Sequence, residues 1–239
     1  MKQSSPWKPL NRLLEGLSAD ACGYLRDELH LIDLIPGQVV YEAGAAQNTM
    51  YFPRTGIISL LYVLENGSTS EIAMVGNEGM IGVALLVDSH STPTRAVVQA
   101  AGTAYALRAE IVDREFRRGS EFQFVVLRYT QALLTQMAQT GVCNRHHTVD
   151  RQLSRWLLQA DDRVSAGEIR MTQEQIAHLL GVRREGITEA ARRLQEEGCI
   201  RYSRGVIQVL DRDCLLARSC ECYSVVQREY DRLLSLRGR

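Results

Sequence analysis

The alternation of apolar and polar residues divides the chain into a β-like part and a helical part. Between residues 31 and 107, short β-branched and aromatic runs are separated by glycine-containing turns. Asn66-Gly67 lies between two such runs and predicts a hairpin, because both residue types tolerate positive φ. Several short strands at this spacing are typical of an antiparallel sandwich or barrel. We therefore expect an α+β protein whose first part is an antiparallel β-barrel of the jelly-roll type.

A long helix is predicted to begin at about Glu121 and to end near residues 143–148. Apolar side chains recur there at intervals of three or four residues, which places them on one helix face. This stripe consists of Phe122, Val126, Tyr129, Leu133 and Met137. Val125, Leu127 and Leu134 widen it, so the helix can pack against its own domain and also against a second copy of the chain. Burial of the helix wholly within its own subunit is the alternative.

Two shorter helices joined by a tight turn follow. Thr172 is a good N-cap for a helix over residues 173–180, and Gly181 can end that helix in the left-handed conformation. A second helix then runs from about Arg184 to Gly198, with its apolar residues facing inward. Two helices connected in this way form a helix-turn-helix.

The residues after this unit predict a wing. Residues 200–202 and 206–210 have the pattern of two short strands around a turn, with Arg204 at its tip. Asp211 or Asp213 can then cap a final helix that contains the Cys-Glu-Cys sequence. A winged helix-turn-helix places its second helix in the major groove of DNA and its wing near the backbone.

Several polar residues of this unit have the chemistry of a DNA-binding surface. Arginine can donate two hydrogen bonds to guanine, and glutamate can accept one from cytosine N4. The residues expected to reach base edges are Arg184, Glu185, Thr188 and Glu189. Those suited to phosphate contacts are Thr172, Gln173, Arg183, Arg192, Arg193 and Arg204. For any single one of them the alternative is a solvated charge paired along the helix, such as Glu189 with Arg193.

Composition and charge are those of an ordinary globular protein. Of the 239 residues, 45% are hydrophobic and 23% are charged, and the formal net charge is zero. Residues 142–205 carry slightly more arginine than acidic residues, a mild bias toward nucleic acid. No apolar run approaches the roughly 20 residues of a membrane span, and the start of the chain lacks the apolar core of a signal peptide. We expect no membrane association and a cytoplasmic location.

The six cysteines predict neither a disulfide framework nor a metal site. Their spacing is not dense or regular. Cys220 and Cys222 form a C-x-C pair without a second close pair, so reduced thiols beside a helix are expected. His146 and Asp150 can share a helix face, but no third strong ligand is evident nearby. We predict no metal ligand and no certain cofactor, and assign His146 and His147 to hinge polarity or protonation-sensitive hydrogen bonding.

With these motifs, the chain resembles the Crp/Fnr family of bacterial transcription regulators over nearly its whole length. Residues 35–82 are similar to the family's cyclic-nucleotide-binding-type barrel, and residues 172–194 to its DNA-recognition unit. The long helix is similar to the family's dimer helix. The resemblance implies a homodimer that binds near-palindromic double-stranded DNA and contacts RNA polymerase. It also implies a small-molecule or nucleotide effector, of unknown identity, at the barrel.

The expected effector pocket departs from the family's cyclic AMP pattern. That pattern is G-E-L followed by R-S-A or R-T-A, and the corresponding positions here are Gly82, Val83, Thr94 and Arg95. Val83 cannot accept the hydrogen bond of a ribose hydroxyl. Arg95 lies one position after the expected phosphate ligand, so in a strand its side chain should point to the opposite face. Cyclic AMP bound in the family's usual manner is not expected.

Other departures concern cofactors and the DNA sequence. The N-terminal part contains only Cys22, so the iron–sulfur cluster of oxygen-sensing members is not expected. His30 and His90 are weak candidates for haem and more typical of surface histidines. In the recognition helix, Glu189 stands where the family commonly has a second arginine, so the preference at that base pair should differ by about 1–3 kcal/mol.

We therefore expect three parts: a β-barrel sensor with flanking helices over 1–120, a dimerisation helix and hinge over 121–146, and a winged helix-turn-helix over 147–239. A signal at the barrel would shift the long helices and change the spacing of the two recognition helices. One alternative is a small-ligand or nucleotide sensor whose helix-turn-helix contacts proteins. An enzyme using His146, His147 and Asp150 is another, but no nucleophile motif or phosphate loop supports it.

Overall fold

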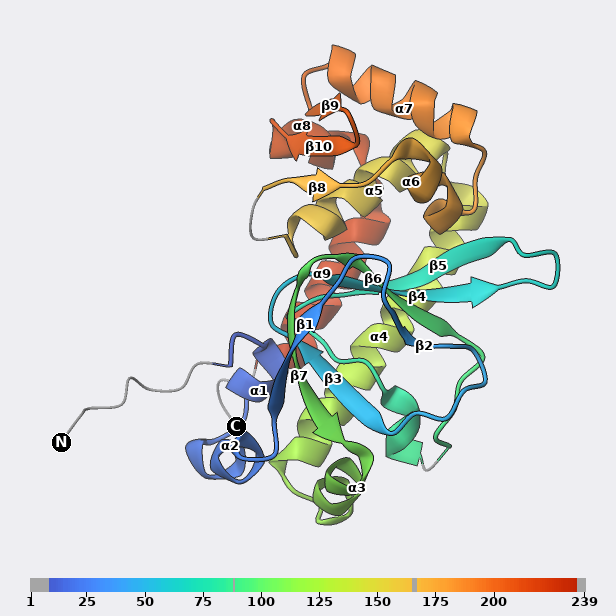
Figure 1. Cartoon of the computed structure of the whole chain (residues 1–239). Helices are drawn as coiled ribbons and strands as arrows, with labels where there is room; N and C mark the ends of the chain where they lie inside the picture. Colours follow the sequence, from blue (N-terminus) through green and yellow to red (C-terminus); the bar gives the residue numbers. More distant parts are fainter. Residues whose placement is uncertain (1–8, 88, 165–166, 236–239) are drawn as a thin grey trace.

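The structure is a computed structural model that describes residues 9–87, 89–164 and 167–235 (Figure 1). The first eight residues, which belong to the segment where no signal peptide is expected, lie outside the described residues. The chain forms a β-rich N-terminal part, a long helix and a helical C-terminal part, which confirms the predicted α+β class. Within the described ranges, no helix is both long and apolar enough to cross a membrane.

Two antiparallel sheets make up the N-terminal part, which we call the β-roll. One sheet contains, in spatial order, β1 (His30–Leu34), β7 (Gly102–Arg108) and β3 (Thr49–Pro53). The other contains β2 (Val39–Tyr41), β6 (Arg95–Ala100), β4 (Ile57–Val63) and β5 (Thr69–Val75). Apolar side chains from both sheets share one core. The jelly-roll arrangement is confirmed, although the sheets pack as two layers and do not close into a barrel.

The predicted hairpin at Asn66-Gly67 joins β4 to β5. Leu64 N–H donates to the Ser68 carbonyl oxygen at 2.8 Å, and Ser68 N–H donates to Asn66 Oδ1 at 3.0 Å. Gly67 has a φ of +81°, a conformation that glycine adopts without steric cost. The local turn chemistry therefore matches the sequence pattern.

Short helices cover the ends of the β-roll. They are α1 (Arg12–Glu15), α2 (Ala19–Arg26), the 3-10 helix η1 (Val83–Val87) and α3 (Ala109–Arg117). Asn11 caps α1 through its side-chain oxygen, and its amide donates to the carbonyl oxygens of Pro53 and Gly79 at 2.8 and 2.9 Å. This buried side chain ties the N-terminal helices to the roll.

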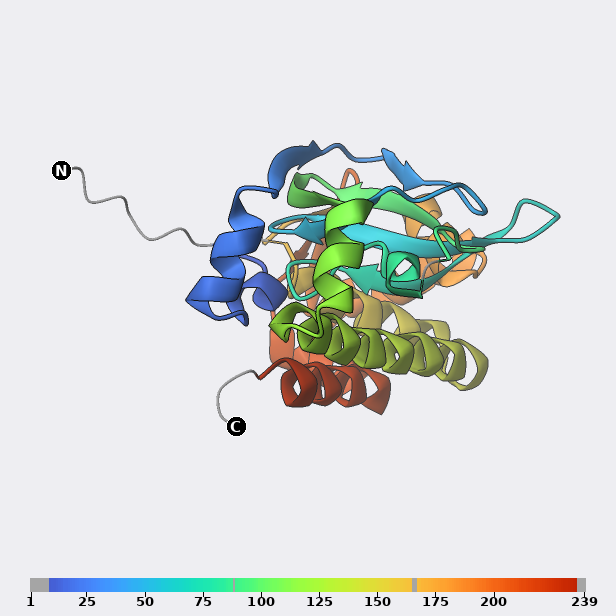
Figure 2. The same cartoon turned by 90° about the horizontal axis from the view of Figure 1, so that it is seen from below.

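The long helix α4 (Glu121–His146) lies between the β-roll and the C-terminal helix α9 (Glu221–Leu234), which runs alongside it (Figures 1 and 2). The rings of Tyr129 and Tyr230 meet edge to face with centroids 6.2 Å apart, and the Tyr230 hydroxyl donates to Gln136 Oε1 at 2.7 Å. The C-terminal helix therefore packs on the long helix and shares the core of the β-roll.

The winged unit begins two residues after α4. It contains α5 (Val149–Asp161), β8 (Ile169–Arg170), α6 (Gln173–Leu180), α7 (Arg184–Glu196), β9 (Ile200–Ser203), β10 (Val206–Val209) and α8 (Arg212–Arg218). Its strands pair antiparallel in the order β8-β10-β9. The predicted wing is present, with β8 as an additional strand that the sequence pattern did not indicate.

Local signals set the boundaries of the two central helices. Thr172 caps α6 in a reciprocal capping box with Gln175. Gly181 ends α6 with a φ of +66°, as predicted for a left-handed C-cap. Asp211 caps α8, but α8 ends before Ser219 and a separate helix, α9, follows. The expectation of one final helix containing the Cys-Glu-Cys sequence is therefore wrong, because the chain turns there to reach α4.

The β-roll and the winged unit share an apolar and a polar interface. Ile57, Leu61 and Met74 of β4 and β5 belong to the same buried cluster as Trp156 and Leu180. Trp156 Nε1–H donates to Glu71 Oε1 at 3.0 Å, and Arg163 forms a buried ion pair with Glu78 at 2.7 Å. The winged unit is thus attached to the β-roll directly as well as through α4.

Cys199, the residue before β9, forms a disulfide with Cys214 of α8. The cysteine spacing did not predict this pair, because the two residues approach only when the wing folds back on α8. The remaining cysteines, Cys22, Cys143, Cys220 and Cys222, are free.

Candidate functional site

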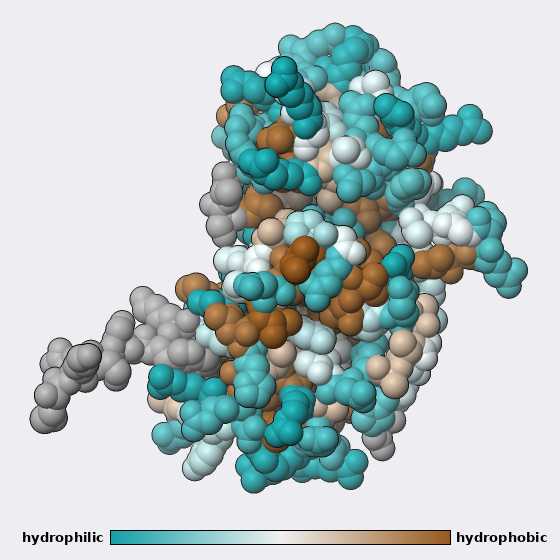
Figure 3. All heavy atoms as spheres, viewed as in Figure 1, coloured by the Kyte–Doolittle hydropathy of each residue, from teal (hydrophilic) through white to brown (hydrophobic). Residues whose placement is uncertain are grey.

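The second helix of the helix-turn-helix, α7, has one buried and one exposed face. Its buried residues are Ile187, Ala190, Ala191 and Leu194. The four residues predicted to reach base edges, Arg184, Glu185, Thr188 and Glu189, are all exposed in its first turns. On the face shown in Figure 3, hydrophilic residues predominate over this end of the molecule. The helix therefore presents a polar surface beside the wing.

A concave surface lies between α6, α7 and the wing. Its volume is about 540 Å³, and it is lined by Thr172, Gln173, Glu174, Arg184, Gln195, Tyr202, Arg204 and Gly205. The Thr188 hydroxyl donates to Gln173 Oε1 at 2.6 Å, which joins the first turns of the two helices. Arg204 has a φ of +50° at the tip of the wing. Arg183, the N-cap of α7, is also exposed.

Arginine–glutamate pairs run along the exposed side of α7. Glu189 Oε1 lies 2.7 Å from Arg192 Nη2 and 2.9 Å from Arg193 Nη1. The hydrogen bond from Arg192 lowers the pKa of the Glu189 carboxyl. Arg193 also binds Asp150 of α5 through two contacts of 2.7 and 2.9 Å. Glu189 is thus paired with Arg192 and Arg193, and Arg193 is also paired with α5.

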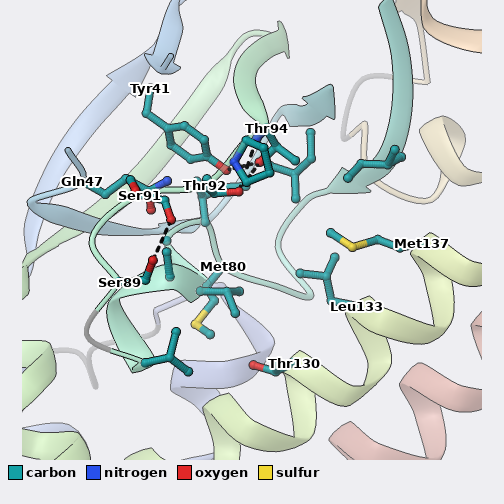
Figure 4. A pocket seen from close by; sticks show the side chains of 18 of the residues that line it. Tyr41, Gln47, Met80, Ser89, Ser91, Thr92, Thr94, Thr130, Leu133 and Met137 are labelled. Carbon is teal, nitrogen blue, oxygen red and sulfur yellow. Dashed lines mark hydrogen bonds between the residues drawn. The ribbon is translucent and has the colours of Figure 1, made fainter. Parts of the chain in front are cut away.

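A second hollow, of about 430 Å³, lies between the β-roll, η1 and α4 (Figure 4). Three of the predicted effector residues, Gly82, Val83 and Thr94, line it. Arg95 does not: its Nε lies 3.0 Å from Glu42 Oε2. From the helix side it is lined by Thr130, Leu133, Leu134 and Met137. The hollow therefore contacts both the sensor sheet and the long helix.

The polar groups of this hollow are neutral. Thr94 Oγ1 is within 3.3 Å of the Tyr41 hydroxyl and 3.0 Å of Thr92 Oγ1. Gln47 is only 4% exposed, and its amide nitrogen and oxygen make no hydrogen bond of good geometry. None of the described residues that line the hollow carries a charged side chain. A ligand phosphate would therefore find no cation among them, whereas the Gln47 amide is available to a neutral polar group.

The face of α4 that remains open to a partner differs from the predicted stripe. Phe122, Val126, Tyr129 and Leu133 are buried in the protomer's own core, and Met137 packs partly against it. The exposed apolar side chains are Phe124, Leu127, Leu134 and Val142, which are 47–62% exposed. Of the residues predicted to form or widen the stripe, Leu127 and Leu134 belong to this face. The sequence indicated two apolar faces but assigned most residues to the one that the protomer itself covers.

Two family models match successive parts of the chain. The cyclic nucleotide-binding domain model matches residues 32–118, which is most of the β-roll, and the Crp-like helix-turn-helix domain model matches residues 151–218. The chain belongs to the Crp/Fnr family of transcription regulators. It is a DNA-binding transcription regulator with a cyclic-nucleotide-binding-like domain.

Several solved structures have the same fold, among them a regulator of the Crp/Fnr family. FixK2 from Bradyrhizobium japonicum is 16% identical with a TM-score of 0.69, over 80% of this chain and 98% of that one. The c-di-GMP-responsive global regulator CLP from Xanthomonas campestris is 13% identical, with a TM-score of 0.65 over 80% and 99%. TTHA1359, a regulator from Thermus thermophilus, is 18% identical, with a TM-score of 0.62 over 82% and 98%. A comparison with curated protein sequences found no match.

In this Crp/Fnr regulator, one cluster of potential metal ligands escaped the sequence analysis. Cys143 and His147 at the end of α4 meet Cys220 and Cys222 at the start of α9. His146, in contrast, is exposed, and Asp150 is bound to Arg193, so the pair considered from the sequence does not form a site. The available signal was C-x₃-H at the end of one helix and C-x-C at the start of another. Only the packing of α9 on α4 brings these together.

Proposed function

We propose that this regulator acts as a homodimer that reads a near-palindromic DNA site with α7. The observation that carries the proposal is the exposed polar start of α7 beside the concave surface and the wing. A recognition helix enters the major groove with its N-terminal residues toward the base edges. Arg184 lies in the first turn of α7 and its side chain is 64% exposed; its Nε is 3.7 Å from Glu174 Oε2. It is therefore the arginine best placed to bind a guanine.

The other polar residues of the unit divide by position. Glu185, Thr188 and Glu189 extend the base-reading side of α7, and Glu189 also orients Arg192 and Arg193. Phosphate contacts are proposed for Thr172, Gln173, Arg183, Arg192, Arg193 and Arg204. Arg193 must leave Asp150 to make such a contact, so we expect it to contribute less than Arg204. RNA polymerase is the further protein partner that we propose for a regulator of this family.

The DNA proposal is tested by selecting bound sequences from a random pool and measuring affinities over a range of salt. Arg184→Ala should remove the base preference at one symmetric position of the enriched sequence, a loss of about 1–3 kcal/mol in binding free energy for the preferred base. Arg204→Ala should weaken binding to all DNA sequences alike. It should also reduce the steepness of the fall of log affinity with log salt by about 0.9 for each phosphate that the side chain no longer neutralises.

Arg228→Ala, at an exposed position of α9, is the matched control and should change neither quantity. Enrichment of no two-fold-symmetric sequence, together with an affinity insensitive to salt, would instead favour a sensor that acts through protein contacts.

The exposed apolar face of α4 is the surface that we propose for dimerisation. Burying a leucine stabilises an interface by about 1.5–3 kcal/mol, and a symmetric dimer buries each residue twice. Leu127→Glu should therefore raise the dimer dissociation constant by roughly 100-fold or more, as measured by sedimentation equilibrium. Ile35→Glu introduces the same charge at a 65% exposed apolar residue far from α4 in sequence and should leave the dimer unchanged. An unchanged association of the Leu127 variant would show that another surface is used.

We further propose that the hollow beside α4 binds a neutral, largely apolar effector. Its lining supports this class, because the described side chains offer apolar area and a buried amide but no cation for a phosphate. A ligand there contacts Leu133 and Met137 of α4, and Gln136 on the same helix donates to the Met74 carbonyl oxygen at 3.1 Å. Occupancy can therefore shift α4 and with it the spacing of the two recognition helices, which must match half-sites about 34 Å apart.

A further inference from the structure

Four ligand-bearing side chains converge where α4 ends and α9 begins. Cys143 lies in the last turn of α4, His147 caps that helix, and Cys220 and Cys222 flank the first residue of α9. The three cysteines are buried, and the His147 side chain is 11% exposed. Their ligand atoms all lie within 4.8 Å of one another. Nothing in the DNA-binding function requires such a cluster.

The distances within the cluster match those around a single tetrahedral ion. Cys143 Sγ and Cys220 Sγ are 3.6 Å apart, and Cys222 Sγ is 3.4 Å from His147 Nδ1. Zinc binds sulfur at about 2.3 Å and nitrogen at about 2.0 Å, so tetrahedral ligands lie roughly 3.6–3.8 Å apart. An iron–sulfur cluster distributes its cysteines over several iron atoms and needs a wider arrangement. The compact set therefore favours one ion.

The surroundings of the cluster orient its ligands. His147 Nε2 faces Glu221 Oε1 at 3.6 Å, which leaves Nδ1 toward the sulfurs. A carboxylate on the second ring nitrogen is the usual support of a metal-bound histidine. On the other side, Gln139 Nε2–H donates to Cys222 Sγ at 3.1 Å, a contact that stabilises a thiolate. These two neighbours are an independent indication of a metal centre.

We propose that Cys143, His147, Cys220 and Cys222 form a closed Cys₃His site for a single Zn²⁺ ion. Binding replaces the three thiol protons, which are released to solvent, and uses the neutral imidazole. The four protein ligands complete the tetrahedron, so the ion is structural and has no open position for catalysis.

The ion would join the hinge of the protein to its C-terminal helix. His147 and Thr148 are the residues between α4 and α5, and α9 packs along α4. A metal bond at His147 fixes where α4 ends relative to α9 and thus limits how the winged unit can turn. This inference does not depend on the proposed effector or on the DNA sequence that is read.

The test uses the full-length protein, reduced and freed of metal, titrated with Co²⁺ alone and then with Zn²⁺. We expect equimolar Co²⁺ binding with the strong visible absorption bands of tetrahedral cobalt bearing thiolates, and bleaching when Zn²⁺ displaces it. Cys222→Ser should weaken the sulfur-to-cobalt bands and lower the affinity. The Cys22→Ser variant, which lacks a cysteine outside the cluster, should bind Co²⁺ with the same affinity and absorption bands as the unmodified chain.

A second variant keeps the test informative if the cysteine variant does not fold. Glu221 is 69% exposed, so Glu221→Gln should leave the fold intact while lowering Zn²⁺ affinity by about 10–100-fold. Absence of tetrahedral cobalt bands in the reduced, folded chain would overturn the proposal. So would iron and sulfide held by these four residues, or a Cys143–Cys220 disulfide as the stable state under reducing conditions.

Discussion

Replacing Arg163 with methionine is expected to lower the free energy of unfolding by about 3–5 kcal/mol, because the Glu78 carboxylate would remain buried without its counter-charge. The two side chains are only 5% and 10% exposed. Arg163 Nε and Nη2 donate to Glu78 Oε1 at 2.9 and 2.7 Å, and Nη1 donates to the Gln159 carbonyl oxygen at 2.7 Å. Urea denaturation followed by circular dichroism measures the change.

A more exposed arginine–glutamate pair and a double variant are the controls for this buried pair. Arg170→Met removes an arginine that is 76% exposed in its pair with Glu168, and should cost at most about 1 kcal/mol. Adding Glu78→Leu to Arg163→Met should recover much of the loss, since neither charge is then left unpaired. Equal costs for the Arg163 and Arg170 variants would mean that the buried pair does not stabilise the junction of β-roll and winged unit.

The stability of the protein should also fall as pH rises from about 5 to 7, through Glu71. Burial raises the pKa of this carboxyl from 4.5 to about 7, against the lowering effect of hydrogen bonds with Ser59 and Trp156. A folded-state pKa above the unfolded value means that the folded state holds the proton more tightly. The stabilisation is complete below pH 4.5 and is lost as pH passes about 7.

Glu71→Gln keeps the shape of the side chain but removes its charge; the amide oxygen can still accept from Trp156 Nε1–H, and the amide nitrogen can donate to the Ser59 hydroxyl. Relative to the unmodified chain, the variant should gain about 3 kcal/mol between pH 4.5 and 8, since one pKa unit corresponds to about 1.4 kcal/mol. Denaturation curves at a series of pH values measure the difference. Glu110→Gln, at an 80% exposed carboxylate of α3, should not alter the profile. A Glu71 variant with the same pH profile as the original chain would contradict the expected protonation of this group.

Local chemistry explains why the winged unit could be predicted closely. The capping box at Thr172 and the left-handed Gly181 involve residues within one or two helical turns of each other. The apolar spacing within α7 likewise places Ile187, Ala191 and Leu194 on the inner face. Such signals act through neighbouring backbone groups, so the sequence alone determines the ends of α6 and α7 and the side they bury.

Only part of the effector hollow could be predicted from local sequence patterns. Strand alternation correctly indicated that Arg95 leaves the face occupied by Thr94. The neutral polar groups of the hollow, above all Gln47, come from loops and helices that no local pattern connects to those positions. Their common location depends on how the two sheets and α4 pack.

The sequence by itself determined the α+β class, the helix-turn-helix with its wing, and the long helix with more apolar surface than one neighbour covers. Only the tertiary structure decided which face of α4 is buried, that α9 returns to that helix, and that Cys143 and His147 meet Cys220 and Cys222. The physical reason is the range of the interactions. Helix periodicity, capping and turns act over a few residues, whereas Cys143 and Cys220 are 77 residues apart in sequence and meet only through the packing of α9 on α4.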